Sequence, residues 1–169
     1  MLTGIGPSGS IRIEWVQHMA WEVVFLSPFH LSHVRKLRVC GLDTHTRSHR
    51  FEPALSAMKH LETVIVDGAS SKGLCGALAR REPAPFCPSL HTLVYCSEWM
   101  GYDFYNVESV AKCRYEAPEV SPLKRLIIAT NIELPSTEEL RELGFYVESL
   151  ELRITTQVPE TWEESSSEW

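Results

Sequence analysis

The sequence predicts an α/β fold in which about six short parallel strands, each backed by an outer helix, stack side by side as a solenoid. One phrase recurs along the chain: an apolar residue, two of any type, an apolar residue, one of any type and a third apolar residue. Successive copies begin 24, 27, 29, 33 and 24 residues apart, and helix signals lie between them. Strands and helices therefore alternate with a period of about two dozen residues.

Each copy of the phrase predicts one strand. The copies occupy 10–15 in degenerate form, and then 34–39, 61–66, 90–95, 123–128 and 147–152. Their last three positions alternate, as in a short strand with every second side chain facing a core. A doubly wound sheet more often shows continuous Val/Ile runs and a glycine-rich turn, and neither G-x-G-x-x-G nor a P-loop pattern is present. The Leu-x-x-Leu-x-Leu motif favours a leucine-rich-repeat arc.

Helix signals separate the strands. The clearest is a capping box at Ser136 and Glu139, with Gly144 at the expected end of the helix. Pro53 suits the first turn of another helix. Further helices are expected from Ser71 to the prolines at 83 and 85, from Asn106 onward, and within 19–27.

Length and composition bound the organisation of the chain. It has 169 residues, 44% of them hydrophobic, which suits one repeat domain at 10–156 after a flexible N-terminus at 1–9. Residues 157–169 hold four Glu and no basic residue, so a disordered acidic tail is expected. Five scattered Cys, no signal-peptide pattern and no apolar run of membrane length indicate a cytoplasmic or nuclear protein.

The charge is unevenly distributed. The net charge is −6, with +3 in residues 1–60 and −9 in the remainder. A charge of +3 over sixty residues is too modest for the strong positive field that binds nucleic acid.

The junctions before the strands at 58–64, 86–93 and 121–126 resemble those of F-box leucine-rich-repeat proteins. The stretch with Trp15, Trp21 and 33–37 is similar to the repeat arrays of F-box-like proteins in mushroom-forming fungi. The resemblance covers about 10–154. It implies a non-enzymatic surface that holds another protein, such as a ubiquitylation substrate of a cullin-RING ligase. No F-box start precedes the first repeat, so the cullin adaptor is expected only where an F-box is supplied elsewhere.

A binding surface follows from the register. One expected column on the concave face runs through positions 12, 36, 63, 92, 125 and 149, and the next through 14, 38, 65, 94, 127 and 151. The middle of the second column is aliphatic with charges at both ends, which predicts an exposed interaction stripe unless a loop of the same chain covers it. An insertion at 98–105 carries four aromatic residues, and it is either a binding element or a local cover. The predicted partner-binding residues are Lys36, Arg38, Ile65, Val94, Trp99, Tyr102, Phe104, Arg125 and Ile127.

No metal, cofactor or catalytic residue is predicted. His45 and His49 have H-x3-H spacing with Cys40 upstream, but no Cys-x2-Cys pair supplies the other half of a zinc site. The cysteines lie in no recognisable Cys–His pattern. The alternatives are a small intracellular α/β enzyme using Cys and His, or a repeat fragment without independent activity. Because nine residues make a thin cap for the first strand, this end is also expected to support self-association.

Overall fold

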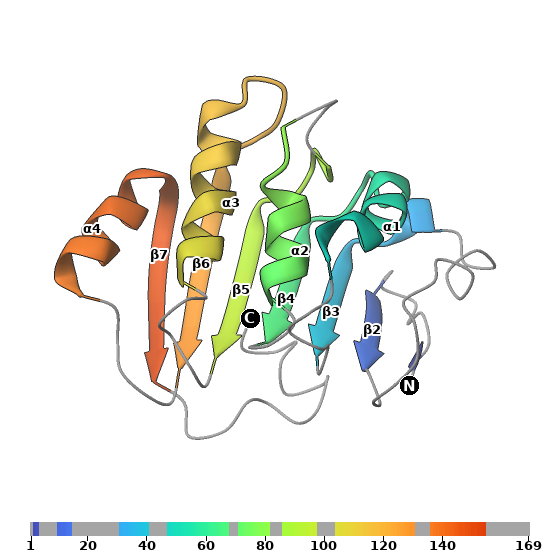
Figure 1. The fold of residues 1–169 in the computed structure, drawn as a ribbon, viewed down its shortest axis with the longest axis horizontal. Coiled ribbons are helices and arrows are strands. Elements are labelled where there is room, and N and C mark those ends of the chain that lie inside the picture. Colours follow the sequence, from blue (N-terminus) through green and yellow to red (C-terminus); the bar gives the residue numbers. More distant parts are fainter. Residues whose placement is uncertain are drawn as a thin grey trace.

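One sheet runs through the part of the chain that this computed structural model describes, residues 2–3, 10–14, 31–40, 47–67, 71–81, 86–97, 104–130 and 136–154 (Figure 1). Its strands are β1 (Leu2–Thr3), β2 (Ser10–Glu14), β3 (Lys36–Cys40), β4 (Thr63–Asp67), β5 (Thr92–Ser97), β6 (Leu123–Thr130) and β7 (Val147–Ile154). They lie across the sheet in chain order. β1 pairs antiparallel with β2, and every later pair of neighbours is parallel. The expected α/β class and parallel pairing are therefore confirmed.

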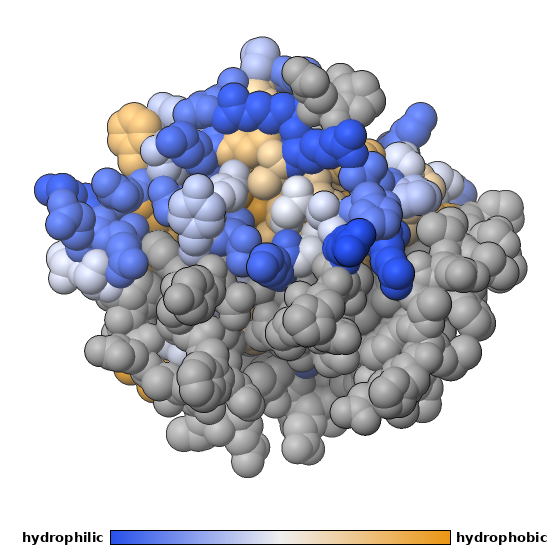
Figure 2. Space-filling view, viewed as in Figure 1, coloured by the Kyte–Doolittle hydropathy of each residue, from blue (hydrophilic) through white to orange (hydrophobic). Residues whose placement is uncertain are grey.

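Helices lie between successive strands along the chain. They are α1 (Glu52–Ala57), α2 (Ser71–Leu78), α3 (Phe104–Glu116) and α4 (Thr137–Phe145), with 3-10 turns η2 (Leu31–His33) and η3 (Ser48–Arg50). Figure 1 shows α2, α3 and α4 on the same face of the sheet. The visible surface of the described residues on this side is largely hydrophilic, with smaller apolar patches between (Figure 2). None of the described helices has the length and apolar character needed to cross a membrane.

Local sequence signals explain where these helices begin. Ser136 caps α4 in a complete capping box, and Pro53 lies in the first turn of α1. Two boundaries differ from expectation. α3 begins at Phe104 rather than at an Asn106 cap, and α4 continues through Gly144 to Phe145. Nothing lies within 4 Å of a Cβ built at Gly144, so no close packing requires glycine there. The expected helix at 19–27 lies outside the described residues.

The main core lies between the sheet and the helices. From β3 to β6 the middle apolar residue of the phrase faces it, and the register aligns Leu37, Val64, Leu93 and Leu126 across four strands, all at most 2% exposed. The first apolar residue of the phrase enters the same core from the bend before the strand or, in β6, from the first residue of the strand. Val34, Leu61, Leu90 and Leu123 are all at most 1% exposed. Each such side chain contributes about 1.5–3 kcal/mol when fully buried.

A repeated backbone arrangement joins the starts of neighbouring strands. The carbonyl oxygen of Arg35 accepts hydrogen bonds from the amides of both Glu62 and Thr63, at 2.8 and 3.0 Å. The same arrangement recurs twice, with the Glu62 carbonyl accepting from His91 and Thr92 and the His91 carbonyl accepting from Lys124 and Arg125. These shared carbonyls satisfy the backbone at each bend and fix one strand start to the next.

The bend before β5 is held by a buried guanidinium from α3. Nη1 of Arg114 donates to the Phe86 carbonyl at 3.2 Å, and Nη2 lies 3.1, 3.4 and 2.9 Å from the carbonyls of Cys87, Pro88 and Leu90. Cys87 has a φ of 52°, a left-handed conformation that non-glycine residues rarely adopt. Arg114 is 0% exposed, and a buried charge is unfavourable unless polar groups compensate it. The dipoles of these carbonyl groups supply that compensation.

The predicted register holds from β3 to β7 and is wrong at β2. Lys36 pairs with Thr63, and the row continues as predicted toward β7. Arg12, however, lies beside Arg38 instead of Lys36, a slip of two residues. Because strand side chains alternate with period two, such a slip keeps every residue on its expected face. The alternation of apolar and polar residues therefore cannot distinguish the predicted register from the observed one.

Candidate protein-binding surface

The sheet face opposite the main core carries six of the nine residues predicted to contact a partner. Its first row consists of Lys36, Thr63, Thr92, Arg125 and Ser149, which we name the polar row. Ser149 is exposed and the other four are half-buried, so each of the five side chains retains some exposure. Parallel register places these five residues side by side near the starts of their strands. Of the predicted partner-binding residues, Lys36 and Arg125 belong to this row.

The second row is buried where an exposed stripe was predicted. Ile65, Val94 and Ile127 are 4%, 0% and 0% exposed, and with Cys96 and Ala129 they form a second apolar cluster. The prediction of an exposed aliphatic stripe is therefore wrong, and the alternative of a covered stripe describes these three residues. Both readings share one sequence pattern, because apolar residues at these positions fit a covered face as well as a contact surface.

Two cations of β3 lie on this face at alternate positions. Arg38 is 3% exposed and pairs in register with Ile65 at the margin of the second cluster. Lys36 is half-buried; burial lowers its pKa, and the positive charge of Arg38 lowers it further. The charged form of Lys36 is therefore less favoured in the folded protein than in the unfolded chain.

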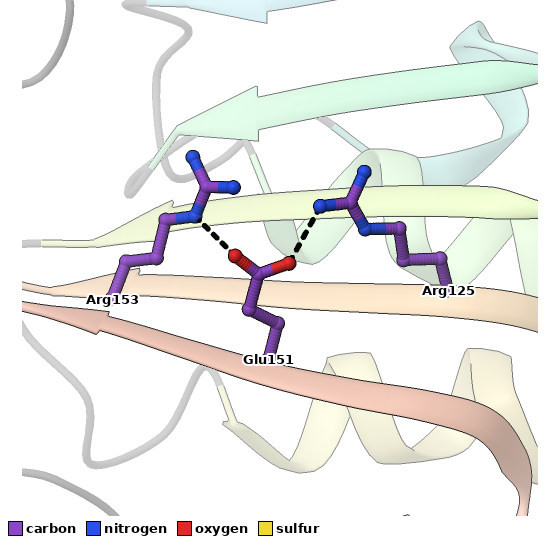
Figure 3. A network of polar contacts seen from close by, with 3 residues as sticks. All are labelled: Arg125, Glu151 and Arg153. Carbon is purple, nitrogen blue, oxygen red and sulfur yellow. Dashed lines mark hydrogen bonds and ion pairs between the residues drawn. The ribbon is translucent and has the colours of Figure 1, made fainter. Parts of the chain in front are cut away.

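Figure 3 shows a carboxylate held between two arginines at the other end of the sheet. Oε2 of Glu151 lies 2.6 Å from Nη2 of Arg125, and Oε1 lies 2.6 Å from Nε of Arg153. These hydrogen bonds, the one from Arg125 first, lower the pKa of Glu151. The three side chains are only partly exposed, at 36%, 33% and 26% for Arg125, Glu151 and Arg153. The network fixes the direction of the Arg125 guanidinium.

Glu151 and Arg153 were not among the predicted partner-binding residues. Once the register with β6 is known, the sequence Glu-Leu-Arg at 151–153 places Glu151 and Arg153 on the same face of the strand, and this pattern could have identified them. Of the aromatic insertion, Trp99 and Tyr102 lie outside the described residues, and Phe104 begins α3. The role of this insertion therefore stays a prediction.

The described thiols are buried. Cys75, Cys87, Cys96 and Cys113 are buried thiols that form no disulfide, and burial raises the pKa of Cys87 to about 12. That thiol is neutral at physiological pH, which is unfavourable for a nucleophile. Within the described ranges, no group of three or more His, Cys, Asp or Glu is placed to hold a metal ion. His45 lies outside those ranges.

Comparison with known proteins adds no family to this geometry. No protein-family model matches the chain, and neither a curated protein nor a solved structure matches it. The residues that define the surface are therefore those given by burial, register and charge: the polar row, the β3 cations and the Arg125–Glu151–Arg153 network.

Proposed function

We propose that this chain is a non-enzymatic protein–protein interaction scaffold, built as a leucine-rich-repeat arc. The observation that carries the proposal is the order of the sheet: consecutive strands pair in parallel from β2 to β7, in constant register from β3 onward. Stacked units of this kind present equivalent side chains in straight rows over an extended surface, which suits contact with another protein. The polar row is such a surface.

The charges of the surface favour an acidic partner. Lys36 and Arg38 lie on β3 toward one end of the sheet, and Arg125 and Arg153 flank Glu151 toward the other. Electrostatic complementarity of this kind guides association and orients the partner. By its resemblance to F-box repeat proteins, the partner is a protein held for ubiquitylation. The ligase itself joins only through an F-box supplied elsewhere.

The proposal is tested by affinity purification from cell lysate with matched charge reversals. Lys36→Glu reverses a charge in the polar row, whereas Lys112→Glu makes the same change on an exposed position of α3. We expect Lys36→Glu to reduce recovery of the captured protein at least tenfold and Lys112→Glu to leave it unchanged. Both variants should retain the thermal midpoint of the wild type within a few degrees. Equal capture by both would contradict a role for the polar row.

The same purification tests the ligase connection. We expect the cullin adaptor to be absent from the eluate of this chain alone and present when an F-box protein is part of the complex. Recovery of the adaptor with the isolated chain would show a different docking mode.

The aromatic insertion is tested separately by a double substitution. Trp99→Ala with Tyr102→Ala should abolish capture of the partner, because large rigid aromatic side chains dominate the energy of interfaces. The thermal midpoint should stay within a few degrees. A large fall in the midpoint would instead identify the insertion as part of the core.

A further inference from the structure

The last strand exposes apolar side chains in rows that are buried in the strand beside it. On the helix side, Ile128 of β6 is 0% exposed, whereas its neighbour Leu152 in β7 is 36% exposed. The next row repeats the contrast, because Thr130 is 0% exposed and Ile154 is 75% exposed. Apolar side chains of the kind that are buried inside a sheet are therefore exposed on β7.

The backbone edge of β7 is equally open. Among the described strands β7 pairs with β6 alone, and it is eight residues long. Proteins commonly protect such edges with proline, lysine, a bulge or a very short strand. The segment Val147–Ile154 contains no proline, glycine or lysine. At the opposite end of the sheet, by contrast, β1 pairs antiparallel with β2. Among the described strands, β7 is the longer of the two edge strands, with eight residues against two in β1. The self-association expected at the N-terminal end stays a prediction.

We propose that two copies of this chain pair through β7, antiparallel, about a two-fold axis at Leu152. In this register Leu150 lies opposite Ile154 of the second copy, and the symmetry repeats the pair. On the other face of the strand Glu151 lies opposite Arg153 of the second copy, again twice. One face of the joined strands is then apolar and the other alternates in charge, and both kinds of cross-strand pair are stabilising.

Neighbouring registers are less favourable. A two-fold axis at Glu151 sets that carboxylate against its own copy, and an axis at Arg153 does the same with two guanidiniums. Like charges directly opposite destabilise paired strands. The axis at Leu152 avoids both contacts and extends the Arg125–Glu151–Arg153 network across the interface. This inference goes beyond the proposed function and does not depend on it.

The edge is tested with the full chain by light scattering and analytical ultracentrifugation over a concentration series. We expect the molar mass to rise with concentration toward twice 19.2 kDa. Ile154→Arg should hold it at one copy while leaving the thermal midpoint of a dilute sample unchanged, because the side chain is 75% exposed. Tyr105→Arg is the matched control: Tyr105 is 71% exposed on α3, and its variant should still dimerise.

The register is tested by complementary charge reversal. Glu151→Lys and Arg153→Glu should each abolish dimerisation, because each sets like charges opposite across the two-fold axis. An equimolar mixture should restore a dimer containing one copy of each variant, detected by native mass spectrometry, because the new lysine then faces the new glutamate. This rescue cannot come from variants that fail to fold.

Three results would overturn the proposal. The first is a wild-type chain that remains monomeric at every concentration, also where residues 155–169 protect the β7 amides from hydrogen exchange. The second is a dimer that persists in the Ile154→Arg variant. The third is a mixture of the two charge variants that does not associate.

Discussion

Arg114 is a residue whose burial is tolerated only because of what surrounds it. An isolated buried cation is strongly unfavourable, and burial lowers the pKa of Arg114 accordingly. The compensation comes from the carbonyl groups of the bend that contains Cys87. A planar guanidinium can serve several of them at once because its donors are arranged in a fixed fork. The side chain therefore supports a bend that the local backbone conformation alone would not favour.

Replacing Arg114 should consequently be severe. Arg114→Met removes the donors and leaves buried carbonyl groups unsatisfied, so the free energy of unfolding should fall by about 3–5 kcal/mol. Arg114→Lys should recover only part of the loss, because an ammonium cannot span the same carbonyls. Urea unfolding measures both changes. The control is Arg141→Met, whose 78% exposed side chain should matter by less than about 0.5 kcal/mol. A loss of under 1 kcal/mol for Arg114→Met would refute this role.

At the scale of the element, the start of α4 is specified by two residues. The Ser136 hydroxyl accepts from the Glu139 amide at 3.3 Å, and the Glu139 carboxylate accepts from the Ser136 amide at 2.8 Å. Hydrogen bonds from the Ser136 side chain first, and then from its backbone, lower the pKa of Glu139. Its ionised form is therefore stabilised by folding.

The pH dependence of stability follows from the direction of that shift. Because the folded pKa lies below the ordinary value of 4.5, the contribution of Glu139 is present above that pH and is lost as pH falls through the folded pKa. Glu139→Gln should thus lower stability at pH 7, and this loss should diminish as the pH is lowered below 4.5. Ser136→Ala should cost about 1 kcal/mol at pH 7. Urea unfolding over this pH range tests this, with Glu142→Gln, exposed on the same helix, as the matched control.

These elements were predictable because their signals are local. The capping box at Ser136, the proline of α1 and the register from β3 to β7 all follow from spacing along the chain. The two-residue slip at β2 was not predictable, because a shift of two residues leaves the alternation of apolar and polar side chains unchanged. Arg114 was equally hidden, because its carbonyl partners lie in a bend 24 to 28 residues earlier in the sequence.

At the scale of the whole molecule, the sheet has apolar clusters on both faces. The main core lies under the helices, and the second contains Ile65, Val94 and Ile127. The sequence predicted the apolar rows but left the burial of the second one open, because the same alternation of residues fits an exposed face and a covered one. Of the predicted contact residues whose burial the structure describes, Lys36 and Arg125 remain accessible, and both are polar.

A substitution in the second cluster distinguishes a core residue from a contact residue. Ile127→Ala should lower the free energy of unfolding by about 2–5 kcal/mol, because Ile127 is 0% exposed and its truncation leaves a cavity. Ile128→Ala, a neighbour buried on the opposite face, should cost a similar amount, whereas Tyr105→Ala on the exposed side of α3 should cost little. Chemical denaturation compares the three. An Ile127 variant as stable as wild type would mean that its side chain is not packed.

The shared carbonyls of Arg35, Glu62 and His91 also determine where the chain can change its length. They fix the strand starts to one another, so an insertion at a bend would separate a carbonyl from its two amides. The connections through the helices lie away from these shared carbonyls, apart from the Arg114 contacts between α3 and the bend before β5. The unit from β5 to β6 is the longest, at 33 residues. Lengthening a surface connection carries only a small entropic penalty. Natural variants of this architecture should therefore differ in the length of the connections on the helical side, whereas the number of residues in each bend should stay constant.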